Sequence, residues 1–545
     1  MVAKFGLRSS MAVAVYMLGA ATAWSADQAD LVTINRIVDE GFNRSELPAT
    51  ASYLTDRIGG RLTNSPQMRE AERWTQQQFR DCGLKNVRTE GFEFGRGWSI
   101  EKSSTRLLKP RIAEYRSIPV AWTPSTNGAI NAPIIVAPLS READFERWKG
   151  KLRGQIVLVT RPDGGSEPAI APFVRLSPED IGKLNAHRQP TVPMAEELEK
   201  RLERIRFESK RDAFLAAEGA LAWVSMSYRD GGLLHGEGYQ HRTGESPKLP
   251  GFELAAEHYR QLARLAKVGP APVIELLSVV QYHDEDRNGY NVLADLPGRE
   301  AKAGYVMSGA HLDSWVASDG AQDNGAGSAV VMEAARILSK LGLKPKRTIR
   351  FALWSGEEQG LYGSIDYTQR HLVSRAPLQD PAQAALPAYF TWNLRWPVKA
   401  GPDYDALAAY FNIDNGSGKV RGLYAEGNIA VTPILKTWLA PFASMGADAV
   451  VAAPTGGTDH VPMQAVGIPG FQFVQDPLDY GSRIHHTSID SYDHLKMEDL
   501  KQAAVILASL LWMSAERDEP LPKMPLPTKP LQTDPFEYEL PEPAR

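Results

Sequence analysis

Two short apolar runs, residues 305–307 and 348–354, are each followed within a few residues by side chains that bind metals or transfer protons. The first run leads to His311 and the second leads to the adjacent pair Glu357 and Glu358. Apolar residues at helical spacing lie between the runs, which predicts a strand, a helix and a second strand. Because loops at the carboxyl ends of parallel strands meet at one sheet edge, we expect an α/β fold with a functional site there.

The residue types in these loops suit a hydrolytic metal site. Imidazole and carboxylate oxygens are ligands for zinc, and one carboxylate can bridge two ions about 3.5–4 Å apart. We expect Asp323 to be that bridge, Glu358 a ligand and Glu357 the general base. Asp313 is placed to hold the other ring nitrogen of His311. Either His-x-Asp or Glu-Glu alone is typical of a solvated surface pair, so the prediction depends on their occurrence together at successive strand ends.

Four motifs in this order resemble the M28 family of zinc metallopeptidases, and within it the carboxypeptidase Q type. They are His311-Leu312-Asp313-Ser314-Trp315, Trp354-Ser355-Gly356-Glu357-Glu358-Gln359-Gly360, Gly457-Thr458-Asp459-His460-Val461-Pro462 and His485-His486-Thr487-Ser488-Ile489-Asp490. The resemblance covers residues 30–115 and 285–517. It implies the zinc exopeptidase fold, which is a mixed, mostly parallel sheet flanked by helices.

The same resemblance implies two zinc ions and a set of ligands for them. One ion would be held by His311, Asp323 and Asp414, and the other by Asp323, Glu358 and His486. Glu357 would be the general base. Asp414 follows an apolar run, and without the resemblance it reads as a turn aspartate before Asn415-Gly416. His485 occupies a position where some relatives carry a tyrosine that binds the tetrahedral intermediate, and the alternative is a pocket-lining histidine.

Residues 1–26 have the pattern of a signal peptide. Lys4 and Arg8 precede an apolar run, 11–23, that is too short for a comfortable membrane span, and small residues follow it. We therefore expect an exported protein, periplasmic or secreted, with no membrane contact after cleavage. A retained N-terminal anchor is the alternative.

The rest of the chain divides by its periodicity. We expect the N-terminal part of the peptidase domain at 27–115, an inserted β-rich domain at 116–284, the catalytic domain at 285–518 and an extended proline-rich tail at 519–545. The insertion resembles a protease-associated (PA) domain. Within it, the densely charged stretch 196–210 is either a solvated amphipathic helix or a cover for a substrate or partner. The aromatic residues of 389–396 form either a lid over the cleft or a loop docked on the core.

The formal net charge is only −4, and no basic stripe stands out, so the sequence suggests no nucleic-acid partner. The expected substrate is a dipeptide or short peptide, cut by an aminopeptidase or dipeptidase, with a carboxypeptidase of the same family as the alternative. A glutaminyl-cyclase-like enzyme with one zinc and a non-catalytic receptor-like protein share the fold. Other divalent metals could fill the site. A homodimer is suggested by relatives alone.

Overall fold

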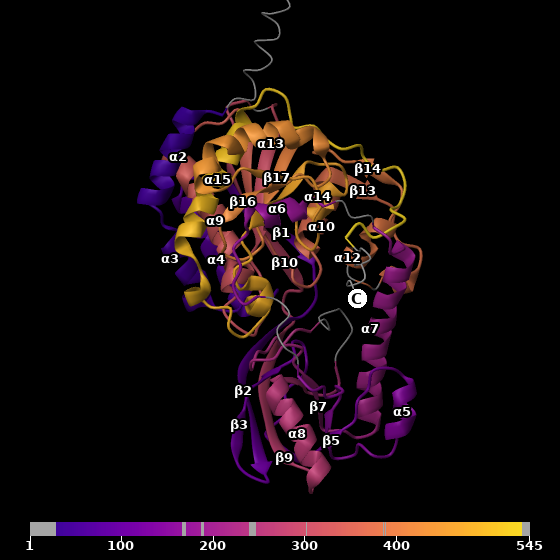
Figure 1. The fold of residues 1–545 in the computed structure, drawn as a ribbon. Coiled ribbons are helices and arrows are strands. Elements are labelled where there is room, and N and C mark those ends of the chain that lie inside the picture. The colour runs from indigo at the N-terminus through magenta and orange to yellow at the C-terminus, as the bar shows by residue number, and fades with distance from the viewer. Residues whose placement is uncertain are drawn as a thin grey trace, which may run out of the picture.

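The computed structural model describes residues 29–165, 171–186, 190–238, 247–300, 302–384, 386 and 388–536. Two eight-stranded sheets organise the chain, one in the upper part of Figure 1 and the other in the lower part. The signal peptide predicted at 1–26 lies outside the described residues. Within the described part of the chain, no helix combines the length and the apolar composition needed to cross a membrane.

The upper sheet is mixed, and its four central strands run parallel. Its strands in spatial order are β1 (Lys85–Glu93), β10 (Asn288–Leu296), β12 (Thr348–Trp354), β11 (Tyr305–His311), β15 (Leu407–Asn412), β18 (Gly470–Gln475), β16 (Val420–Tyr424) and β17 (Ala449–Val451). The pairs from β12 to β18 are parallel, whereas β1, β10 and β16 join antiparallel neighbours. His311 lies opposite Trp354, the last residue of β12, so two predicted site loops leave the sheet side by side.

Helices cover both faces of this sheet. One face is covered by α2 (Leu31–Asn43), α3 (Leu47–Ser52), α4 (Pro66–Asp81), α9 (Ala326–Lys340), α13 (Thr432–Leu439) and α15 (Met497–Glu516), which share one hydrophobic core with it. The opposite face packs against α10 (Tyr362–Tyr367), α14 (Val461–Gln464) and the hairpin of β13 (Val373–Arg375) with β14 (Val398–Ala400). The expected fold class, a mixed and mostly parallel sheet flanked by helices, is confirmed.

The predicted helix between the two apolar runs forms as α9. All of its residues from Ala326 to Leu338 are buried, because the helix lies between the sheet and α15. Its C-terminal end is followed by Gly342 in the left-handed region, with φ of +64°, which ends a helix at little cost for glycine. Short-range pattern was therefore sufficient for this part of the fold.

The lower sheet is formed by residues 97–283. Its order is β3 (Ala113–Tyr115), β2 (Gly97–Lys109), β9 (Val273–His283), β5 (Ile130–Val136), β6 (Ile156–Leu158), β7 (Ala222–Met226), β8 (Gly251–Leu254) and β4 (Ser117–Pro119). Helix α8 (Ala256–Val268) packs on it. The sheet begins at Gly97, before the boundary expected at residue 116, because β2 pairs with β9 along nearly its whole length.

Three segments from this region reach the upper part of the molecule. Helix α6 (Pro178–Leu184) contacts β17, and the long helix α7 (Met194–Ala217) runs beside both sheets (Figure 1). The third segment, residues 228–238, lies near the site described below. The described part of the tail, 519–536, contains no helix or strand, yet the main-chain N–H groups of Met194 and Asp534 join it to the start of α7.

Arg61 is fully buried and fixes the loop that follows β11. Its guanidinium donates hydrogen bonds to five main-chain carbonyls, those of Leu312, Leu54, Gly59, Asp319 and Gly320, at 2.7–3.2 Å. Burial lowers the pKa of Arg61 to about 10, so the group is still charged at neutral pH. One side chain therefore connects the N-terminal segment to the loop before Asp323.

We predict that Arg61→Met lowers the free energy of unfolding by about 3 kcal/mol, because five carbonyls lose a charged donor. Urea denaturation followed by circular dichroism measures the change. Arg57→Met is the matched control, since Arg57 is exposed and has no hydrogen bond or ion pair within the described residues. Equal stability of the two variants would contradict the role assigned to Arg61.

Candidate metal centre

The predicted site residues gather at the carboxyl edge of the parallel strands. His311 is the last residue of β11, and Asp323 lies between β11 and α9. Glu357 and Glu358 follow β12, and Asp414 follows β15. The remaining pair, His485 and His486, comes from the loop after β18. Side chains from the segments that follow four strands therefore meet at one sheet edge, as parallel topology requires.

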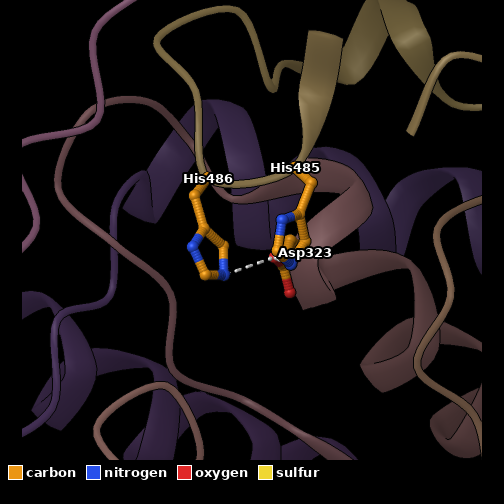
Figure 2. A group of neighbouring side chains, drawn as sticks. All are labelled: Asp323, His485 and His486. Carbon is orange, nitrogen blue, oxygen red and sulfur yellow. Dashed lines mark ion pairs between the residues drawn. The ribbon is translucent and has the colours of Figure 1, made fainter. Parts of the chain in front are cut away.

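Asp323 lies between two histidines. Its Oδ1 is 3.2 Å from Nε2 of His311, and its Oδ2 is 3.4 Å from Nε2 of His486. Figure 2 shows His486 directed toward this carboxylate. Nε2 of His311 is also 3.2 Å from Oδ1 of Asp414, and Nε2 of His486 is 3.0 Å from Oε2 of Glu358. The two oxygens of one aspartate thus face two separate groups of nitrogen and oxygen donors.

Backbone contacts fix this arrangement. The carboxylate of Asp490 accepts hydrogen bonds from the main-chain N–H groups of Gln322, at 2.7 Å, and Asp323, at 3.0 Å. The ring of His311 has its Nδ1 2.9 Å from the main-chain oxygen of Asp313, so that Nε2 is directed at the acids. Asp490 and the main chain of Asp313, which do not belong to the donor groups, therefore fix the positions of Asp323 and His311.

The contact of Asp313 differs from the expected one. Its carboxylate is 3.7 Å from the His311 ring, and the main-chain oxygen makes the hydrogen bond instead. The carboxylate accepts from the hydroxyl of Thr63 at 3.0 Å and from the N–H groups of Glu357 and Glu358 at 3.4 and 3.3 Å. The side chain of Asp313 therefore holds the loop that carries Glu357 and Glu358, while its main-chain oxygen holds the ring of His311.

Glu237, which the sequence analysis missed, holds the second histidine. Its Oε1 is 2.7 Å from Nδ1 of His486 and also accepts from the hydroxyl of Tyr228 at 3.1 Å. Burial opposes the ionisation of Glu237, but the hydrogen bond and charge of His486 outweigh it and lower its pKa. The two partners are 249 residues apart, and no motif surrounds Glu237, so no sequence signal pointed to it.

His485 lies over the same acids. Its Nε2 is 3.7 Å from Oδ2 of Asp323, and its ring stacks on that of His486 with 3.7 Å between centroids. Burial, together with the charge of His486, lowers the pKa of His485 to about 4. The imidazole is therefore neutral at physiological pH.

The donor atoms fit a bound cation. Oδ2 of Asp323 and Oε1 of Glu358 are buried and have no hydrogen-bond partner among the described residues, whereas buried polar atoms normally have one. Burial, and after it the charge of Asp323, raise the pKa of Glu358 to about 7. Burial also raises the pKa of Glu357 well above its ordinary value. A metal ion at this position would bind the two oxygens that have no hydrogen-bond partner and would compensate the negative charge of the neighbouring carboxylates.

A cavity of about 510 Å³ opens over these residues. Glu357, Glu358, Asp414 and both histidines of the 485–486 pair line its floor. Tyr389 and Phe390 of the aromatic segment form part of its wall, and α7 contributes Arg204, Ile205 and Glu208. The helix expected at 196–210 is thus part of the wall of the cavity.

Comparisons with known proteins agree with this geometry. Residues 291–511 match the model of peptidase family M28. Carboxypeptidase Q of Bos taurus is 25% identical over 473 residues, which cover 87% of this chain and 86% of that protein. Carboxypeptidase Q of Homo sapiens is 24% identical over 474 residues and covers the same shares.

Two solved structures share the fold. A peptidase M28 precursor from Shewanella amazonensis SB2B superimposes with a TM-score of 0.62 at 22% identity, covering 91% of this chain and 98% of that one. BSAP, a zinc aminopeptidase from Bacillus subtilis, gives 0.54 at 19% identity and covers 87% and 95%. The expected resemblance to the M28 peptidases is confirmed, since residues 291–511 match the model of that family, and the chain is an enzyme.

Proposed function

We propose that the chain is a dinuclear zinc exopeptidase that hydrolyses dipeptides or short peptides. The observation that carries the proposal is the position of Asp323, whose two oxygens face His311 on one side and His486 on the other. A carboxylate in that position is suited to bridge two ions. We assign His311, Asp323 and Asp414 to one zinc ion and Asp323, Glu358 and His486 to the other.

The nitrogen and carboxylate donors suit zinc. Bound zinc would lower the pKa of a water molecule toward about 7 and polarise the carbonyl of the peptide. The chain itself fixes the donors, since Asp490, Asp313 and Glu237 each hold one ligand-bearing loop or ring from behind. Such support is what keeps metal ligands in one orientation.

Glu357 is the residue that we propose moves protons. It lines the cavity, lies 4.0 Å from Nε2 of His311, and has its N–H directed at the carboxylate of Asp313. In this role its carboxylate takes a proton from the attacking water and passes it to the nitrogen of the leaving amine. Neutral His485, which also lines the cavity, is positioned to donate a hydrogen bond to the oxyanion of the tetrahedral intermediate.

The same proposal includes the inserted domain and the location of the protein. We assign the insertion 116–284, which supplies most of the lower sheet, to the PA domain that the sequence resembles. We propose that the protein is exported, periplasmic or secreted. The complete set of donors, together with Glu357, supports an enzyme over a receptor-like protein.

Replacement of the proposed base separates chemistry from metal binding. We predict that Glu357→Gln keeps both zinc ions and lowers kcat by about 100-fold or more, because proton transfer by a positioned side chain contributes that much. Metal content by atomic absorption and kcat on a dipeptide measure the two effects. His486→Ala is the comparison variant and is expected to lose zinc. A Glu357→Gln enzyme with nearly full activity would remove this residue from the mechanism.

Replacement of the residue behind His486 tests the contribution of the insertion. We predict that Glu237→Gln weakens the affinity for one of the two zinc ions by about 10- to 100-fold, because a carboxylate partner raises the basicity of a histidine ligand. Competition with a chromophoric chelator measures the affinity.

The matched control for this prediction is Glu285→Gln, since Glu285 is exposed and has no hydrogen bond or ion pair within the described residues. Unchanged affinity for both ions in Glu237→Gln would show that the 2.7 Å contact does not support the ligand.

A further inference from the structure

We propose that Arg204 of α7 binds the free carboxylate at the C-terminus of the peptide substrate, so that the enzyme selects peptides with an unblocked C-terminus. The inference rests on the proposed peptidase function and supplies the substrate class that the metal centre by itself leaves open. It is carried by the position of Arg204 on the wall of the cavity and by its lack of any partner in the chain.

The position of α7 is set by apolar packing. Leu198 and Leu202 are buried against Leu386, and Ile205 and Phe390 pack on the same cluster. The next residues along this side of the helix, Arg204, Ile205 and Glu208, line the cavity over the proposed zinc site. Packing of the leucines therefore fixes the helix in a register that places Arg204 at the cavity.

The start of α7 is anchored a second time. The main-chain N–H of Met194 donates to the oxygen of Gln532, and the N–H of Asp534 donates to the oxygen of Val192, at 3.0 and 2.9 Å. The C-terminal tail thus holds the beginning of the helix, and the leucine cluster holds its middle. Two separate sets of contacts therefore fix the part of α7 that leads to Arg204.

Neighbouring arginines on α7 are already paired. Arg201 is 2.8 Å from Glu197, and its guanidinium lies 4.8 Å from the ring of Phe390. Arg206 is 3.0 Å from Glu199. Arg204, in contrast, has no ion pair, hydrogen bond or ring contact in the part of the chain that the structure describes. Its guanidinium is the one on this part of the helix that is available to a ligand.

A guanidinium on this wall favours a carboxylate as that ligand. Among the described residues that line the cavity, Arg204 is the sole arginine or lysine, and it lies on α7, away from the acids and histidines that we assign to the metal site. Glu208 is one turn away and could bind an α-amine, but it already has an interaction within the chain. A guanidinium presents paired donors that match the two oxygens of a carboxylate.

The test compares free acids with amides. For the zinc-loaded full chain, kcat/KM is measured on a set of dipeptides and tripeptides and on the C-terminal amides of the same sequences. We expect the wild-type enzyme to prefer the acids by at least about tenfold, and Arg204→Met to reduce that acid-to-amide ratio by about tenfold or more, mainly through KM, because a hydrogen bond to a charged group has this magnitude. Arg204→Lys should keep part of the preference.

Arg206→Met is the matched control. Arg206 lies on the same helix, is exposed and is absent from the cavity wall, so its replacement should leave the ratio unchanged. Two results would overturn the proposal. One is a wild-type enzyme that cuts amides as well as acids, and the other is an Arg204→Met enzyme that loses activity on acids and amides equally.

A binding measurement separates this inference from the peptidase function itself. Calorimetry with the zinc-loaded Glu357→Gln chain gives the dissociation constants of one acid and its amide without turnover. Tighter binding of the acid that disappears with Arg204→Met supports the carboxylate site, and equal affinity overturns it. If the wild-type chain binds the acid preferentially but hydrolyses none of the peptides, the proposed function fails while the carboxylate site stands.

Discussion

The structure depends on how it keeps several carboxylates close together at one buried sheet edge. Asp323, Glu357, Glu358 and Asp414 lie around His311, and like charges at such distances destabilise one another unless a cation or a hydrogen-bond donor compensates them. His311 and His486 provide part of that compensation, because their ring nitrogens lie 3.0–3.4 Å from oxygens of Asp323, Asp414 and Glu358. The orphaned oxygens of two of the acids show where compensation from within the described chain is incomplete, and that is where we place the metal ions.

A second set of acids holds the loops that carry the first. Asp490 binds the N–H groups before and at Asp323, and Asp313 receives those of the two glutamates. Arg61 then ties the intervening loop to the N-terminal segment through five carbonyls. Each of these contacts is made to a main-chain group, so the side chains of the metal-binding residues are not used to hold their own loops. They remain directed at one another and at the cavity. The contacts to the loop backbone are therefore what makes the site rigid.

Sequence pattern was sufficient wherever the information is local. The strands before His311 and Asp414 and the helix α9 follow from short apolar runs and helical spacing, and the parallel topology then brings their ends together. Glu237 could not be found in this way, because its contact with His486 spans 249 residues and depends on the packing of two sheets. The carbonyl of Asp313, which lies 2.9 Å from Nδ1 of His311 while its carboxylate lies 3.7 Å away, was likewise not indicated by the sequence pattern.

The insertion has a direct part in the site. The sequence left the charged stretch 196–210 open between a solvated helix and a cover, and packing of Leu198 and Leu202 against Leu386 places it on the cavity wall. The parallel sheet fixes the donors for chemistry, whereas the insertion supports one histidine through Glu237 and presents Arg204 to the cavity. Because the two tasks lie on separate elements, substitutions on α7 can alter which peptides are accepted without moving the groups that would hold the metals.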